Sequence, residues 1–159
     1  MTINICFTII LLSILSFISI EDINTMLISE TKIILLMKSG IIYLLYLGLS
    51  NEKKDIKDII ITNSLSMVII FTIMYSISYV SFKIFGINSL GIGDIKLSSI
   101  STLWIGIELS FLSLCISFLL SAIYSLCGKL SQKFTPFQQY PFAPFLSIGI
   151  FSSWIIDKI

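Results

Sequence analysis

The stretch of sequence that decides the fold is an apolar run in the second half of the chain. Residues 97–127 read LSSISTLWIGIELSFLSLCISFLLSAIYSLC. At a rise of about 1.5 Å per residue, one straight helix of this length would be far longer than the roughly 30 Å hydrocarbon core of a bilayer. Glu108 would be costly in the middle of a span, whereas it would be solvated at a turn beside Gly106. We therefore expect a turn there, between spans at about 84–105 and 109–127.

Apolar segments also fill most of the remaining chain. Hydrophobic residues make up 56% of the sequence and charged residues only 12%, which is too little charge to cover the surface of a soluble domain. The apolar surplus must face lipid, which predicts an all-α bundle of about six transmembrane helices in a single domain over residues 1–159. No Lys or Arg precedes the first segment, so we expect a retained span rather than a cleaved signal peptide. The other predicted spans are 3–20, 33–49, 59–82 and, as a shorter segment, 142–156.

Charge and residue types exclude several classes of function. The net charge is +1 and the chain contains no Arg or His, so it offers neither a basic surface for nucleic acid nor a His-based triad or metal site. Cys6, Cys115 and Cys127 form no Cys-x-x-Cys pair, which argues against a zinc knuckle. We therefore expect no nucleic-acid partner and no metal.

The lysines between the predicted spans give a weak indication of topology. Counted on alternate sides of the membrane, they show a slight excess on the face that carries the loop from Glu21 to Lys32. Positive residues favour the cytoplasmic side, so we expect this loop in the cytoplasm and the N-terminus outside. The lysines on this face are Lys32, Lys83, Lys96, Lys129 and Lys133, and those on the other are Lys53, Lys54, Lys57 and Lys158.

Two aspartates are expected to meet at one face of the membrane. Between Asp22 and Asp94 the chain crosses the bilayer and returns, because two complete predicted spans separate them. Each carboxylate lies at the end of a span, close to hydrocarbon, and two carboxylates that share such a site tend to hold one proton between them. One can then take a proton from water while its protonated partner donates to a carbonyl, as in aspartic proteases.

Glycines flank the second aspartate in the segment Gly91-Ile92-Gly93-Asp94-Ile95-Lys96. Gly91 and Gly93 allow backbone conformations closed to other residues and close approach of a substrate chain. An ordinary interhelical turn, with Asp94 as the N-cap of the next helix, explains the same residues equally well. No Gly-x-Gly-x-x-Gly or P-loop pattern is completed, so nucleotide binding is not indicated.

Three segments together resemble the type IV prepilin peptidases and the related preflagellin peptidases, which are membrane aspartic proteases of the Gly-x-Gly-Asp class. Residues 91–97, GIGDIKL, resemble the signature that gives the class its name. Residues 22–30, DINTMLISE, resemble the first motif, an Asp followed by a Thr and then by Ile-Pro-Asp/Asn. Residues 141–146, PFAPFL, resemble the closing Pro-Phe-x-Pro segment. The three segments occur in family order and span nearly the whole chain.

The resemblance implies a site and a substrate. Asp22 and Asp94 would be the catalytic pair, supported by Gly91, Gly93, Lys96, Pro141 and Pro144, and they would cleave the short basic leader from prepilin-like or pseudopilin-like proteins at the cytoplasmic face of the inner membrane. No metal or organic cofactor would be required. The chain has no room for the cytoplasmic methylation domain of the full-length bacterial enzymes, so we expect a peptidase only. Ser29 and Glu30 depart from the family pattern, where Pro and then Asp or Asn are usual.

Several alternatives remain open at this stage. Glu21 adjoins Asp22 and could be the reactive carboxylate, although its spacing fits the motif less well. Lys96 could contact substrate, pair with a carboxylate or snorkel to the interface. Pro141 and Pro144 could shape the start of the last helix rather than touch substrate. At the level of function, the alternatives are a catalytically degenerate scaffold of a pilus or secretion apparatus and a small channel or transporter.

Overall fold

The structure, a computed structural model, describes residues 2–50, 56–86, 90–132 and 139–158, so Lys53, Lys54 and Lys133 of the topology count lie outside the described residues. The described chain is helical and contains no strand, which confirms the predicted all-α class. Its five helices are α1 (Thr2–Thr25), α2 (Glu30–Ser50), α3 (Ile56–Phe85), α4 (Ile92–Leu130) and α5 (Ala143–Lys158).

Four of these helices, α1 to α4, are long and apolar enough to cross a membrane. The fifth, α5, has 16 residues and is shorter than a typical span. The protein is therefore a multi-pass membrane helix bundle, as predicted. The expected number of about six helices is slightly too high, because the two spans predicted on either side of the turn belong to one element, α4.

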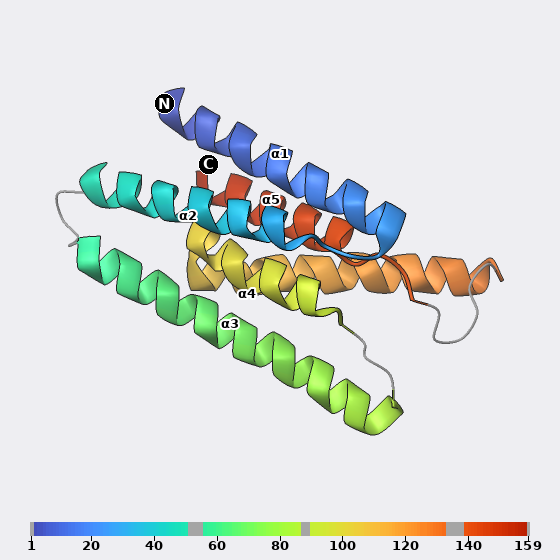
Figure 1. Ribbon diagram of the computed structural model, residues 1–159. Coiled ribbons are helices and arrows are strands. Elements are labelled where there is room, and N and C mark those ends of the chain that lie inside the picture. The colour runs from blue at the N-terminus through green and yellow to red at the C-terminus, as the bar shows by residue number, and fades with distance from the viewer. Residues whose placement is uncertain (1, 51–55, 87–89, 133–138, 159) are drawn as a thin grey trace.

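The chain reverses direction inside α4. Gly106 has φ 71° and ψ 178°, a conformation outside the helical region that is accessible almost only to glycine. Figure 1 shows the two arms of α4, residues 92–105 and 107–130, running in opposite directions from this point. Glu108 is exposed just beyond it, as expected for a charged residue at a turn. The length of the apolar run predicted that a break occurs, and Gly106 and Glu108 predicted its position.

The predicted start of the span before this turn, at about residue 84, was wrong. Ile84 belongs to the end of α3, and α4 begins only at Ile92. The physical reason is Gly86, which has φ +70° and donates its N–H to the carbonyl of Phe82 at 2.8 Å. A glycine in the left-handed region with this hydrogen bond is a common way to end a helix.

The last helix occupies the centre of the bundle. In Figure 1 α5 lies between α1 and α4, and it packs against both. Leu146, Ile150 and Trp154 on α5 are fully buried. At Gly149 the backbone of α5 comes so close to Ser113 on the second arm of α4 that a side chain there would clash. Figure 1 also shows α1 beginning and α5 ending at the same end of the bundle, so the polar residues considered next, at the other end, come together from both halves of the chain.

We predict that Gly106→Ala destabilises the bundle by about 1–3 kcal/mol, because a Cβ is strained at this φ and ψ. No atom lies within 4 Å of the position that this Cβ would occupy, so the cost comes from the backbone and not from a clash. Equilibrium unfolding in detergent micelles measures the loss. The control is Glu108→Ala, an exposed helical neighbour that should change stability by less than about 0.5 kcal/mol. Equal losses of stability in the two variants would contradict the claim that the backbone conformation at residue 106 disfavours a side chain.

Candidate active site

Asp22 lies near the end of α1 and is buried, with 5% of its surface exposed. Its Oδ2 accepts a hydrogen bond from the backbone N–H of Ala143 at 2.9 Å, and the amide of Phe142 also interacts with the carboxyl group. Ala143 is the first residue of α5, 121 residues further along the chain, and Phe142 directly precedes it. Asp22 therefore satisfies the free amides at the N-terminus of another helix, where negative charge is also favoured by the helix dipole.

The local sequence explains why these amides are available. The carbonyl of Phe142 accepts hydrogen bonds from the N–H groups of Phe145 at 3.1 Å and Leu146 at 3.2 Å, so Phe142 is the N-cap of α5. Pro144, in the first turn, has no N–H to offer, and Pro141 precedes the helix. One turn further on, Ser19 on α1 donates to Ser147 on α5 at 2.9 Å. This contact holds the two helices together beside the Asp22 hydrogen bond.

Asp94 lies in the first turn of α4 and is also buried, with 9% of its surface exposed. Gly91 is the N-cap of this helix, so the alternative that placed Asp94 at the N-cap is wrong. A Cβ on Gly91 would lie 3.2 Å from Oδ2 of Asp94, and the Gly91 amide interacts with the carboxyl group. The other oxygen, Oδ1, has no hydrogen-bond partner among the described residues. Asp94 thus presents a buried, unpaired oxygen.

Gly93 has a different role, which is to let two segments approach closely. A Cβ at this position would lie 3.1 Å from Cβ of Ile28, in the connection between α1 and α2. That connection turns sharply at Met26, whose φ is +54°. Gly93 therefore leaves room for Ile28 to pack directly against the first turn of α4, beside Asp94.

The two aspartates face the same cavity, which has a volume of about 970 Å³. Asp22 comes from α1 and Asp94 from α4, and the two are close enough for electrostatic interaction between their carboxyl groups. The rest of the wall is mostly apolar and aromatic with a few hydroxyl groups. Its members include Tyr75, Ser78, Tyr79, Phe82, Phe118 and Tyr140.

Glu21 is held by Ser29, which directly precedes α2, and by Lys32 on α2. Its Oε2 accepts hydrogen bonds from both the N–H and the hydroxyl of Ser29 at 3.0 Å, and Lys32 lies 3.2 Å away. Glu21 is not among the described residues that line the cavity. The structure therefore does not support Glu21, in place of Asp22, as the carboxylate that acts with Asp94. Ser29 in turn caps α2, since its carbonyl accepts from the N–H of Lys32 at 3.2 Å. The residue that departs from the family pattern thus links α1 to the start of α2.

Lys96 pairs with Glu30, which begins α2. Of the three roles considered for this lysine, the structure shows the ion pair with a carboxylate. Both side chains are partly exposed, so the pair contributes little to stability and chiefly ties α2 to α4 beside the aspartates.

Two features of the site could not be located from motifs. The hydrogen-bond donor to Asp22 is a backbone amide, which leaves no trace in residue type. The wall on α3 does have a signal, since Tyr75, Ser78, Tyr79 and Phe82 follow the i, i+3, i+4, i+7 spacing of one helix face. In an apolar span that periodic cluster of hydroxyl and aromatic residues would have indicated a face turned toward the protein.

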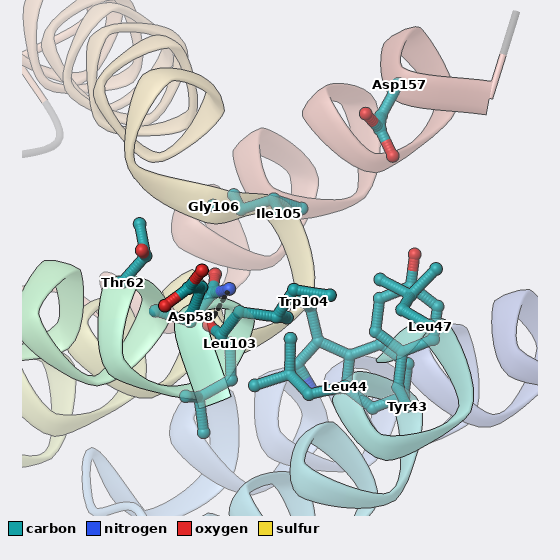
Figure 2. A pocket seen from close by; sticks show the side chains of 12 residues that line it. Tyr43, Leu44, Leu47, Asp58, Thr62, Leu103, Trp104, Ile105, Gly106 and Asp157 are labelled. Carbon is teal, nitrogen blue, oxygen red and sulfur yellow. Dashed lines mark hydrogen bonds between the residues drawn. The ribbon is translucent and has the colours of Figure 1, made fainter. Parts of the chain in front are cut away.

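A second cavity, of about 500 Å³, lies beside the turn at Gly106 and contains neither aspartate of the pair. Figure 2 shows Asp58 and Thr62 from α3 on one side of it, Asp157 from α5 on another, and Tyr43 and Trp104 on a third. Asp157 is already paired with Lys158 at 2.7 Å. The carboxyl groups here come from separate walls and form no facing pair in Figure 2.

In the described part of the chain, no group of three or more Cys, Asp and Glu side chains is placed to hold a metal ion. What the larger cavity does offer is two buried carboxyl groups from different helices. Asp22 is held by backbone amides, and Asp94 has one oxygen, Oδ1, without a partner among the described residues. Such a pair can activate water and protonate a carbonyl without a metal.

The fold and the site define a class: a multi-pass, all-helical membrane protein with two buried carboxyl groups facing one cavity. A match to the type IV leader peptidase family covers residues 9–126, well over half of the chain. The protein belongs to that family, and the predicted membership is confirmed. The match contains both aspartates and ends before Pro141. No curated protein and no solved structure matches the chain.

We predict that Ser29→Pro, which introduces the residue usual in the family, lowers the thermal unfolding midpoint of this protein. Proline removes both the N–H and the hydroxyl that Ser29 donates to Glu21. In a Glu21→Ala background these hydrogen bonds are already absent, so Ser29→Pro should lower the unfolding midpoint much less. Thermal unfolding in micelles of the wild type, the two single variants and the double variant measures the coupling. An equal loss in both backgrounds would show that Ser29 and Glu21 are independent.

Proposed function

We propose that this protein is a membrane-embedded aspartic endopeptidase that removes the basic leader from type IV prepilin-like or pseudopilin-like proteins. The observation that carries the proposal is that Asp22 and Asp94 face one cavity, although they come from different helices. Membership of the type IV leader peptidase family supports the peptidase activity. The aspartic mechanism and the identity of the substrate go beyond family membership and are proposed here.

The reaction needs only water and the two carboxyl groups. One carboxylate takes a proton from water as its oxygen attacks the scissile carbonyl carbon, and the protonated partner donates to the carbonyl oxygen. Collapse of the tetrahedral intermediate then breaks the C–N bond, and the proton taken from water passes to the leaving amine. The cavity of about 970 Å³ has room for an extended peptide segment between α3 and the two aspartates.

The cavity suits a membrane-inserted substrate. The apolar and aromatic wall on α3 would accommodate the apolar segment of such a substrate, and Glu30, which is paired with Lys96, lies at the same end of the bundle as the aspartates. The lysines Lys32, Lys83, Lys96 and Lys129 are predicted on this same face. We therefore propose that the protein resides in the inner membrane with its active site toward the cytoplasm.

The degenerate scaffold is a weaker reading of the same chain. Its main support was Ser29, which departs from the family pattern. Because Ser29 caps α2 and donates twice to Glu21, the departure has a structural role of its own and need not signal a lost activity.

We predict that Asp22→Asn and Asp94→Asn each reduce leader cleavage by at least about 100-fold, because each removes one partner of the acid–base pair. The measurement is co-expression with a prepilin from the same genome and a gel shift that reports leader removal. Glu21→Gln is the matched control: it is the neighbouring acid, its carboxylate accepts from Ser29 and does not line the cavity, and cleavage should persist. All variants should be recovered from the membrane fraction. Cleavage near the wild-type level by either Asn variant would contradict the proposal.

A further inference from the structure

We propose, on the basis of this proposed function, that the two aspartates have fixed and different protonation states. Asp22 is the ionised carboxylate that accepts the proton from water, and Asp94 is the protonated acid that donates to the substrate carbonyl. The first turn of α5 sets this difference, because it supplies hydrogen-bond donors to Asp22 and none of the described residues supplies one to Oδ1 of Asp94.

The surroundings of Asp22 suit a negative charge. An ionised carboxylate is only an acceptor, and Oδ2 accepts the Ala143 N–H at 2.9 Å, with the Phe142 amide beside it. These amides are among the free N–H groups at the positive end of the α5 dipole. Hydrogen bonds from backbone amides to an ionised carboxylate are stronger than those to a neutral acid. Asp22 is therefore held in its charged form by a helix that belongs to the opposite end of the sequence.

The surroundings of Asp94 suit a neutral acid. The Gly91 amide interacts with its carboxyl group, but Oδ1 is buried and has no hydrogen-bond partner among the described residues. A buried anionic oxygen without a donor is costly. A charged Asp22 facing the same cavity adds repulsion to that cost. A protonated Asp94 has one O–H to donate, and a substrate carbonyl in the cavity would be its acceptor.

The other titratable groups near the pair do not reverse this assignment. Tyr75 and Tyr79 on α3 and Tyr140 before α5 contribute phenol groups to the cavity wall. Glu21 on α1 is engaged by Ser29 and Lys32, and Glu30 on α2 is paired with Lys96 on α4. No lysine of the described chain lines the cavity. Asp22 interacts with two backbone amides, those of Phe142 and Ala143, whereas Asp94 interacts with one, that of Gly91, so the donors at the start of α5 distinguish the two carboxyl groups.

Infrared difference spectra between wild type and each Asp→Asn variant test the assignment without any substrate. At neutral pH exposed acids are ionised, so the carbonyl stretch of a protonated carboxylic acid should come from Asp94. We expect this band in wild type and in Asp22→Asn, and its loss in Asp94→Asn. Its absence from wild type, or its loss in Asp22→Asn with retention in Asp94→Asn, would overturn the proposal. Because no cleavage is required, this result is independent of whether the protein is a peptidase.

A second measurement removes a single donor. Ala143→Pro deletes the N–H that binds Asp22 at the first position of α5, where proline is well tolerated, and Ala143→Val adds the same number of side-chain carbons while keeping that N–H. In the pH profile of leader cleavage, the acid limb reports ionisation of the base and the alkaline limb reports loss of the acid's proton. We expect Ala143→Pro, relative to Ala143→Val, to move the acid limb up by about one pH unit and to leave the alkaline limb in place.

The opposite assignment makes a different forecast for the same variants. If Asp94 were the ionised partner, Asp22 would lose its proton last, so the acid limb would stay and the alkaline limb would move up. That result, or two unchanged limbs, would overturn the proposed assignment. Loss of cleavage in both Asp→Asn variants together with an infrared band assigned to Asp22 would leave the peptidase intact and reject only the assignment of roles.

Discussion

The hydrogen bond from the Ala143 amide to Asp22 is the constraint on which the site depends. It joins the end of the first helix to the start of the last, so the position of Asp22 is fixed only when both ends of the chain have folded against each other. The turn at Gly106 is what makes this possible, because it returns the chain along the second arm of α4 to the end of the bundle where α5 begins. A strained glycine at one end of the bundle thus determines which groups meet at the other.

Polar contacts around the aspartates form a frame that is separate from the chemistry. Glu21, Ser29 and Lys32 fasten α1 to α2, and the pair of Lys96 with Glu30 fastens α2 to α4. Gly93 lets Ile28 approach, so this frame can come close to Asp94 without filling the cavity. Among the acids and lysines of the described chain, Asp22 and Asp94 are the ones that line this cavity.

Most of the fold could be predicted because a membrane span is a matter of length and hydropathy. The turn at Gly106 followed from the excess length of one apolar run, and parity placed Asp22 and Asp94 on one face. The start of α4 was misjudged because Ile84 continues the apolar pattern, and only the conformation of Gly86 ends α3 there. The Ala143 donor could not be predicted. Almost every residue has a backbone amide, and the packing of α5 against α1, not the residue type, decides which amide meets Asp22.

The most direct test of the central claim uses the purified protein alone, in lipid vesicles, with a synthetic substrate that joins a short basic leader to an apolar helix. Mass spectrometry of the products, in the presence of a metal chelator, reports whether and where the chain is cut. The account predicts a single cut that separates the leader from the apolar segment. An intact substrate beside a protein that remains folded and inserted would contradict it.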